Sequence, residues 1–548
     1  MAATLATTLA GLHDPDAPVA SSASASVPGS LPPALAARPV EGIGLDSRLL
    51  ERGDLYLAVA GASTHGIRHA EEALARGAVA IAIDPSDVGR FDPIAARAHA
   101  ALVETGAPLV EVPALAARAG AIAARFHAHP DRALTLVAVT GTDGKTSTCR
   151  FVAAALEALG TPCGYVGTLG WGRGERLERT ALTTPDGVSL QRMLAALRDR
   201  GARAVALEAS SHALASGRLV GVAIDVAVLT NLGRDHLDYH GDLGAYRRAK
   251  GRLFEFPSLT AVVLNGADAF GRELAATTPP SLARVLYAVD PSRAGSSDGP
   301  GEIADADPGA NPDARAERPD AFGGRAQIGA TEIRATPRGL SFTLVDGACR
   351  RAVDSALMGR FNVANLLACH ATLRALGHSP EAAADTLGEL PSVAGRMERF
   401  AAEARPVVVV DYAHTPQALA AAIAAAREHC TAALWVVFGC GGDRDSGKRA
   451  PMGRAAEAAD HVVVTDDNPR GEASADIIAA VLDGMRDRDR ATVIPDRRRA
   501  IAYAVRTAAP ADLVLIAGKG HEDYQIVGER RLALSDRHCV DELLAEAC

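Results

Sequence analysis

The sequence predicts an α/β protein of several domains, built on parallel sheets. Short apolar, β-branched runs alternate with longer amphipathic runs, as in doubly wound parallel sheets. Glycine-rich turns follow several of the apolar runs, at the position where open α/β sheets bind ligands. The chain has 548 residues, too many for one core when a domain averages roughly 150 residues. We expect a leader followed by three domains.

Composition excludes several classes of protein. The net charge is −9, no long basic run occurs and aromatic residues make up 4%, which argues against nucleic acid as a partner. The eight cysteines are scattered without CxxC spacing, so neither a disulfide framework nor a zinc site is expected. The N-terminus has no basic segment followed by an apolar one, and no run of 18 apolar residues occurs. We expect a soluble, cytoplasmic protein without a membrane partner.

The N-terminal part divides at about residue 40. Residues 1–40 are rich in Ala, Ser and Pro and aperiodic, so a disordered leader is predicted there. Residues 41–131 should form a small α/β domain. Its strand candidates are LYLAVAG, AVAIAID and PLVEV, and its helix candidates are HAEEALARG and ALAARAGAIAARF.

A phosphate-binding loop is predicted at the start of the second domain, residues 132–392. The apolar run from Leu134 predicts a buried strand, which ends in Gly141-Thr142-Asp143-Gly144-Lys145-Thr146, and a helical pattern follows from Ser147 to Leu159. A glycine turn at a helix N-terminus binds anions through backbone N–H groups and the helix dipole. Lys145 would add charge for the β/γ-phosphates, and the Thr146 hydroxyl could bind Mg²⁺. Val139 stands where a strict P-loop has its first glycine, so we predict a shorter relative of that loop and an ATP site.

The remainder of this domain continues the alternation. Strands are predicted at GTPCGYVG, AVALEAS and DVAVLTNL, and helices at SLQRMLAALRDRG and from Val363 to Leu376. A segment at about 291–325, rich in Gly, Pro and Asp, interrupts the pattern and is predicted to be a flexible, exposed insertion without a catalytic part.

Residues 393–548 predict a third, Rossmann-like domain. Its five strand candidates are VVVVDY, LWVVFG, HVVVTDD, ATVIPD and LVLIAGKG. Glycine turns follow two of them, at Gly439-Cys440-Gly441-Gly442 and Gly518-Lys519-Gly520. The first turn lacks the last glycine of a dinucleotide fingerprint, where Arg444 stands, so bound NAD is not expected.

Polar residues follow two strands of the second domain. Glu208 ends the run AVAL, where a carboxylate beside a phosphate loop would suit Mg²⁺, although it could also be the first residue of a helix. His236 and His240 follow another strand. They could bind a metal or be hydrogen-bonded structural residues, and their spacing leaves both possibilities open.

Nine motifs in order resemble those of the Mur ligases, from about residue 43 to the C-terminus. They are GTDGKT, LEASSHAL, TNLGRDHLDYHGDLGAYRRAK, GRFNVANLLA, AGRME, DYAHTP, FGCGGDRDSGKR, TDDNPR and AGKGHEDYQ. The match is best to the members of the family that add diaminopimelate. The resemblance implies a small N-terminal α/β domain that binds a UDP-linked substrate, a central P-loop-like ATPase domain and a C-terminal Rossmann-like domain that binds an amino acid.

The activity implied by this resemblance is that of an ATP-dependent acid–amino-acid ligase in peptidoglycan synthesis. The γ-phosphate of ATP would pass to UDP-N-acetylmuramoyl-L-alanyl-D-glutamate, and meso-2,6-diaminopimelate would attack the acyl phosphate. Mg²⁺ is the implied cofactor, and Lys250 matches the family lysine that reacts with CO₂ to form a carbamate. By itself, Lys250 could equally be an ordinary exposed helix lysine. We expect a monomer.

The resemblance also implies roles for individual residues. The implied catalytic residues are Lys145, Glu208, His236 and Lys250. The implied metal ligands are Thr146, Glu208, His236 and the Lys250 carbamate. ATP would contact Gly141, Thr142, Asp143, Gly144, Lys145, Thr146, Ser147, Asn362, Arg396 and Asp411. The UDP-linked dipeptide would contact Leu45, Ser47, Thr183, Thr184, Ser210, Ser216 and Arg218. Three positions depart from the family: Asp143 and Leu182 stand where asparagine occurs, and Ser216 where glutamine can contact substrate.

The diaminopimelate site would comprise Arg444, Asp467, Asn468, Pro469, Arg470, Gly518 and Glu522. Two arginines and a carboxylate suit an amino acid with two carboxylates and two amines, because a guanidinium binds a carboxylate bidentately. Arg470 could instead cap a surface turn after Pro469. The alternatives to this function are an L-lysine-adding Mur ligase, a folylpolyglutamate synthase-like ligase and a P-loop regulatory switch.

Overall fold

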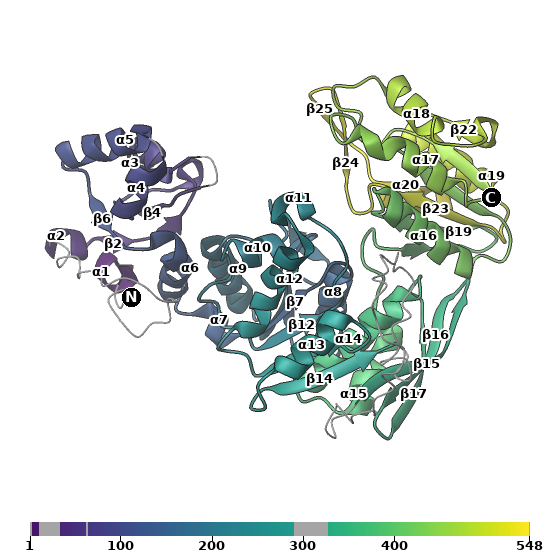
Figure 1. Cartoon of the computed structure of the whole chain (residues 1–548), viewed down its shortest axis with the longest axis horizontal. Helices are drawn as coiled ribbons and strands as arrows, with labels where there is room; N and C mark the ends of the chain where they lie inside the picture. The colour runs from purple at the N-terminus through teal and green to yellow at the C-terminus, as the bar shows by residue number, and fades with distance from the viewer. Residues whose placement is uncertain (1–2, 10–32, 62–63, 92, 290–326, 547–548) are drawn as a thin grey trace, which may run out of the picture. The chain divides into compact units, whose positions relative to one another are not determined.

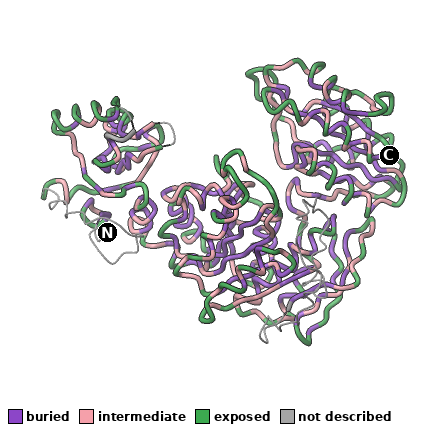
Figure 2. The backbone as a smooth tube through the Cα atoms, in the orientation of Figure 1, coloured by how far each residue is buried: buried purple, intermediate pink, exposed green. Residues whose placement is uncertain are grey.

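The computed structural model describes residues 3–9, 33–61, 64–91, 93–289 and 327–546 (Figure 1). The chain divides into two compact units. One contains residues 1–140, 161–227 and 236–259, and the other contains residues 141–160, 228–235 and 260–548. Buried residues concentrate in the strands and on the inner faces of the helices (Figure 2). The insertion predicted at about 291–325 lies outside the described residues.

The N-terminal sheet has four parallel strands in the order β3-β4-β5-β6. Successive side chains of a strand point to opposite faces of the sheet, so alternate residues enter two separate cores. In β4, Leu55 and Leu57 enter one core, and Tyr56 and Ala58 enter the other. Both faces of this sheet are therefore covered. The elements are β3 Gly42–Gly44, β4 Asp54–Ala58, β5 Ala80–Ile83, β6 Leu109–Glu111, α3 Ala70–Ala75, α4 Pro85–Phe91, α5 Pro93–Glu104, α6 Leu115–Phe126 and α7 Pro130–Ala133.

Part of the leader is ordered, so the prediction of disorder over residues 1–40 is wrong for residues 3–9 and 33–40. Strand β1 (Ala3–Thr4) pairs antiparallel with β2 (Pro39–Val40), with helices α1 (Leu5–Leu9) and α2 (Pro33–Ala36) between them in the chain. Leu5 and Leu9 lie one helical turn apart and are buried in the same core as Leu55. The apolar face of α1 offsets the cost of ordering this short segment.

Five strands of the first unit run in the order β10-β9-β8-β11-β7. Strands β8, β11 and β7 are parallel to one another, whereas β9 is antiparallel to both of its neighbours, β8 and β10. Glu208, the last residue of β11, pairs with Val139 near the end of β7, so both strands end at the same edge of the sheet. The elements are β7 Thr135–Thr140, β8 Cys163–Gly167, β9 Gly170–Arg173, β10 Arg176–Glu178, β11 Ala204–Glu208, α9 Gly187–Asp199, α10 Ser211–Ala215, α11 Leu237–His240 and α12 Leu243–Gly251.

The strands that follow run in the order β12-β13-β14-β15-β16-β17. Strands β13, β14 and β15 are parallel, and β15, β16 and β17 form an antiparallel meander. Helix α14 packs against α8, the helix that follows the phosphate loop. The elements are β12 Val226–Leu229, β13 Ala261–Asn265, β14 Ala283–Ala288, β15 Gln327–Thr336, β16 Gly339–Asp346, β17 Cys349–Ser355, α8 Lys145–Ala158, α13 Ala269–Thr277, α14 Phe361–Ala375 and α15 Pro380–Asp385.

The C-terminal sheet has the order β18-β19-β23-β20-β21-β22, and all its strands are parallel except the edge strand β18. The five predicted strands are confirmed as β19 to β23. Separate cores cover its two faces, one including α16, α17 and α18 and the other α19 and α20. The elements are β18 Glu398–Phe400, β19 Val407–Asp411, β20 Leu434–Phe438, β21 His461–Val464, β22 Ala491–Val493, β23 Leu513–Ala517, the hairpin β24 Tyr524–Val527 and β25 Arg530–Ala533, α16 Pro416–His429, α17 Arg449–Ala456, α18 Ser474–Leu482, α19 Arg497–Thr507 and α20 Asp536–Ala545. Among the described residues, no helix is long and apolar enough to span a membrane.

Candidate functional site

The predicted phosphate loop is a tight turn between β7 and α8. Gly141 and Gly144 have φ angles of 152° and 80°, which residues with a side chain rarely adopt. A Cβ atom on Gly144 would also collide with Oδ1 of Asn365. Thr146 and Ser147 are buried in the first turn of α8. The structure thus confirms the predicted succession of strand, turn and helix N-terminus, a geometry that suits an anion.

The segment after β12 holds the loop backbone in place. The Thr230 hydroxyl donates to the Asp143 carbonyl at 2.6 Å, and the Asp143 N–H donates to Oδ1 of Asn231 at 3.0 Å. The Gly233 N–H donates to the Thr142 hydroxyl at 2.8 Å. The contacts to Asp143 use its backbone while its side chain is exposed, so aspartate in place of asparagine does not disturb this packing.

Lys145 folds back over the loop. Its Nζ donates to the carbonyl oxygens of Gly141 and Thr142, both at 2.8 Å. The ammonium group is therefore held at the loop, where it and the first N–H groups of α8 could together contact a phosphate group.

Helix α14 contributes two asparagines on one face. Asn362, predicted to contact ATP, donates through Nδ2 to the Met358 carbonyl at 2.8 Å and accepts at Oδ1 from Nδ2 of Asn365 at 2.9 Å. Asn365, which touches Gly144, is missing from the residues predicted from the sequence. Its signal was the spacing of three residues in Asn362-Val363-Ala364-Asn365, which places both amides on one side of a helix.

Glu208 is fully buried at the end of β11, and α10 begins only at Ser211, so it is a strand residue and not the start of a helix. Its Oε1 accepts from the Tyr165 hydroxyl at 2.5 Å and from the Thr168 N–H at 3.0 Å. Its Oε2 accepts from the Thr168 hydroxyl at 3.1 Å. These bonds fix the orientation of a carboxylate, which is the kind of hard oxygen ligand that suits Mg²⁺.

Several predicted dipeptide-binding residues surround Glu208. The Thr184 hydroxyl donates to the Glu208 carbonyl at 2.7 Å and accepts from the Ser210 N–H at 3.0 Å. Arg218 donates to the Thr184 carbonyl at 3.1 Å, and the hydroxyls of Thr183 and Thr168 lie 3.1 Å apart. The structure therefore brings four of these residues into one hydrogen-bonded cluster.

The other three predicted dipeptide residues are not part of that cluster. The Ser216 hydroxyl donates to the His212 carbonyl of its own helix at 2.7 Å. Ser47 is buried in the N-terminal domain, where its hydroxyl donates to Oε2 of Glu72 at 2.7 Å. Leu45 packs against the N-terminal core.

Three histidine rings lie close together: His212 is in α10, His236 precedes α11 and His240 ends α11. The His212 ring centroid lies 4.6 Å from that of His236 and 5.6 Å from that of His240. The pKa of His212 is lowered, mainly by burial and secondly by the charges of His236 and His240. Among the described residues, no group of three or more His, Cys, Asp or Glu side chains is arranged to hold a metal ion.

Lys250 is not the exposed helix lysine that its sequence alone allowed. It lies in α12 with 1% of its surface exposed, and its Nζ is 4.5 Å from the centroid of the Tyr246 ring. An ammonium ion is costly to bury, so this position favours a chemical or electrostatic role for the lysine.

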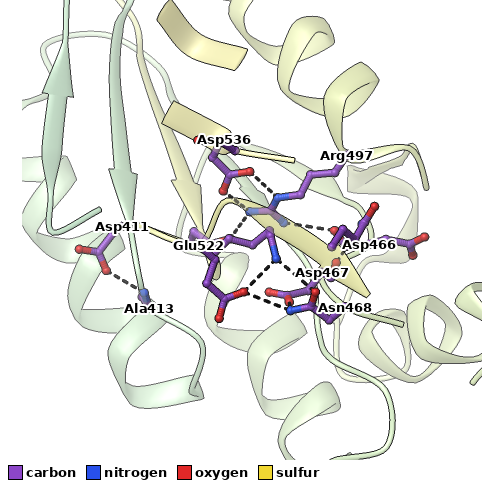
Figure 3. Close-up of polar contacts among 12 residues, drawn as sticks. Asp411, Ala413, Asp466, Asp467, Asn468, Arg497, Glu522 and Asp536 are labelled. Atoms are coloured by element: carbon purple, nitrogen blue, oxygen red, sulfur yellow. Dashed lines mark hydrogen bonds and ion pairs between the residues drawn. The ribbon is translucent and has the colours of Figure 1, made fainter. Parts of the chain in front are cut away.

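Three of the predicted diaminopimelate residues, Asp467, Asn468 and Glu522, lie together beyond the carboxyl ends of β21 and β23 (Figure 3). Asn468 connects them: its Nδ2 donates to Oδ1 of Asp467 at 2.9 Å and to Oε2 of Glu522 at 3.2 Å. The same Glu522 oxygen accepts from the fully buried Lys519 at 3.0 Å. Gly518 has a φ angle of 117°, and a Cβ atom there would lie 2.8 Å from Oδ2 of Asp467.

The two predicted arginines both lie close to Gly441, in the turn after β20. A Cβ atom on Gly441 would be 2.9 Å from Nη1 of Arg470 and 4.0 Å from Cγ of Arg444. Arg470 is half-buried and donates through Nη1 to the Gly442 carbonyl at 2.8 Å, whereas Arg444 is exposed. The Arg470 guanidinium therefore joins the loops after β20 and β21.

Asp411 is the last residue of β19, and Arg396 lies two residues before β18, the strand that pairs with β19. Asp411 accepts from the N–H groups of Met397 and Ala413, both at 2.8 Å, and burial raises the pKa of its carboxyl group. The Arg396 guanidinium lies 4.8 Å from the centroid of the Tyr412 ring. Its buried Nε has no hydrogen-bond partner among the described residues. A phosphate oxygen would supply the missing acceptor.

Comparison with known proteins gives consistent matches along the chain. Residues 39–127 match the model of the Mur ligase family, catalytic domain, residues 139–294 match the Mur ligase middle domain, and residues 395–520 match the Mur ligase, glutamate ligase domain.

Two relatives carry the name UDP-N-acetylmuramoyl-L-alanyl-D-glutamate–2,6-diaminopimelate ligase. The protein of Alkalilimnicola ehrlichii is 44% identical over 93% of this chain and 95% of its own, and that of Pseudomonas aeruginosa is 43% identical over 91% and 94%. A solved structure of a ligase with the same name is 32% identical, covers 99% of both chains and has a TM-score of 0.64.

Proposed function

This chain belongs to the Mur ligase family, and we propose that it joins meso-2,6-diaminopimelate to UDP-N-acetylmuramoyl-L-alanyl-D-glutamate, with ATP converted to ADP and phosphate. The product is a precursor of peptidoglycan. The observation that carries the proposal is the 44% identity to a ligase of that name over 93% of the chain. The meeting of Asp467, Asn468, Gly518 and Glu522 at two strand ends supports the proposed amino acid.

The first proposed step is phosphoryl transfer from ATP to the γ-carboxylate of the D-glutamyl residue, which gives an acyl phosphate and ADP. The N–H groups at the start of α8 and the Lys145 ammonium would balance the charge on the transferred group. Arg396, with its unpartnered Nε, suits a second contact with the nucleotide phosphates. Asn362 and Asp411 are the proposed contacts to the rest of the nucleotide.

Magnesium is the proposed cofactor, and Thr146, Glu208, His236 and Lys250 as a carbamate are its proposed ligands. When bound, the ion would neutralise phosphate charge. Glu208 fits this role because its carboxylate is oriented by Tyr165 and Thr168. The burial of Lys250 supports modification to a carbamate, which would replace a buried cation with an anion close to the metal charge.

In the second proposed step, an amine of diaminopimelate attacks the acyl phosphate, an amide bond forms and phosphate leaves. Glu522 would accept a hydrogen bond from an ammonium group of the amino acid, and Arg444 and Arg470 would bind its distal carboxylate. With L-lysine, Arg470 would keep its desolvation cost and lose its partner. Such unpaired polar groups give discrimination of roughly 10⁴-fold. The proposed enzyme acts as a monomer in the cytoplasm.

The test is ADP formation by the purified protein with ATP, Mg²⁺, UDP-N-acetylmuramoyl-L-alanyl-D-glutamate and a panel of amino acids. We expect strong preference for meso-diaminopimelate. Arg470→Ala should lower kcat/KM for this amino acid far more than it changes the KM for ATP. Arg488→Ala is the control, because Arg488 is an exposed arginine of the same domain that forms an ion pair with exposed Asp483.

Equal or better turnover of L-lysine by the unmodified protein would assign it to the lysine-adding ligases. Activity only with a folate substrate and glutamate would indicate a folylpolyglutamate synthase-like ligase. ATP hydrolysis that is indifferent to all amino acids and to the UDP-linked dipeptide would point to a regulatory switch.

A further inference from the structure

Arg497 is a fully buried cation in the C-terminal domain that none of the motifs above includes. It is the first residue of α19, and its guanidinium forms a bidentate pair with the equally buried Asp536. Nε donates to Oδ1 and Nη2 donates to Oδ2, both at 2.7 Å. Asp536 is the first residue of α20, where the helix dipole also favours its negative charge.

The rest of the guanidinium connects two strand ends (Figure 3). Nη2 donates to the Ala517 carbonyl at 2.9 Å, and Nη1 donates to the Asp466 carbonyl at 3.2 Å. These carbonyls immediately precede Gly518 and Asp467, which begin the two segments of the proposed amino-acid site.

Strands β21 and β23 are not neighbours, because β20 lies between them in the sheet. Each of them pairs with β20, so no ladder of backbone hydrogen bonds joins their ends directly. The planar guanidinium of Arg497 reaches both ends, and its N–H donors point in fixed directions. A lysine could keep the charge opposite Asp536, but its single nitrogen cannot reproduce this arrangement.

We propose that Arg497 is a positioning residue for the amino-acid substrate: it fixes the spacing between the segments Asp467–Arg470 and Gly518–Glu522. The identity of the amino acid rests on the proposed function, whereas the role of Arg497 does not. A buried ion pair is a weak source of stability compared with apolar residues of similar volume, which favours a role in specificity. A displacement of about 1 Å in such a site can cost on the order of a hundredfold in rate.

The experiment begins with the wild-type protein, which identifies the preferred amino acid. Arg497→Lys and the apolar pair Arg497→Met with Asp536→Leu are then compared with it. The double variant removes both charges together, so it leaves no unpaired buried ion. Asp512→Ala is the matched control: Asp512 is also buried, but it accepts from the Ala433 N–H and the Trp435 indole at the opposite ends of β20 and β23.

Both Arg497 variants should raise the KM for the preferred amino acid by at least about tenfold, with the KM for ATP within about twofold of wild type. Discrimination between diaminopimelate and lysine should fall. Asp512→Ala should lower the unfolding midpoint and leave both KM values unchanged. If the wild type prefers another amino acid, the proposed function fails, and the KM for that amino acid tests Arg497.

Two results would overturn the proposal. The first is a wild-type KM and wild-type selectivity in either folded Arg497 variant. The second is failure of both variants to fold, which would make the pair a folding element only.

Discussion

Gly144→Ala should damage both the stability of the phosphate loop and its affinity for ATP. Gly144 precedes α8 with a φ angle of 80°. A residue with a Cβ atom costs about 1–2 kcal/mol in this conformation. The new methyl group would also collide with Oδ1 of Asn365, whose amide donates to Asn362 at 2.9 Å. Breaking such a buried hydrogen bond costs about 1–3 kcal/mol. The total is roughly 2–5 kcal/mol.

The other end of the same helix offers a matched control. Gly160 has a φ angle of 79°, and apart from its chain neighbours no atom of the described residues lies within 4 Å of where its Cβ atom would be. Gly160→Ala should therefore cost only the conformational strain of about 1–2 kcal/mol and leave ATP binding unchanged. The difference between the two variants isolates the collision with Asn365.

The assay is the unfolding midpoint of each variant together with the KM for ATP in the ligation reaction. The double variant Gly144→Ala with Asn365→Ala removes the collision, so its loss of stability should be smaller than the sum of the two single losses. Equal stability and equal KM for ATP in Gly144→Ala and Gly160→Ala would refute the reasoning, and so would strict additivity in the double variant.

Three further outcomes follow from the same structure. Lys145→Ala should lower ligation about a hundredfold at saturating ATP, because loss of a comparable electrostatic contact costs about 3 kcal/mol; near-normal turnover would contradict the phosphate-loop assignment. Lys250→Ala should be nearly inactive and be partly rescued by short carboxylates, whereas full activity without rescue would contradict a carbamate. Burial and nearby Arg396 lower the pKa of His521 from 6.5 to about 4. Between about pH 6.5 and pH 4 the unfolded chain therefore binds a proton at His521 that the folded protein does not bind, so the free energy of unfolding should fall as the pH is lowered through this range. The unfolding midpoint of His521→Gln should fall less than that of the wild type over the same range.

The sequence predicted the elements whose signals are local. The strand before Gly141, the turn and the helix after it are set by neighbouring residues: β-branched side chains favour the strand, glycine permits positive φ angles and the helix begins where these end. For the same reason the five C-terminal strands were predicted correctly. Disorder of residues 1–40 was predicted from their average composition, which does not reveal that Leu5 and Leu9 lie one helical turn apart in α1.

The sequence alone therefore determined the succession of strands and helices, the phosphate loop and the residues carried by family motifs, since each depends on residues close together in the chain. Only the tertiary structure decided which side chains become partners. Asn365 lies 221 positions after Gly144, and Asp536 lies 39 positions after Arg497. Such pairs leave no periodic pattern in the sequence, because they arise when separate strands and helices pack and the buried polar groups of one find acceptors on another.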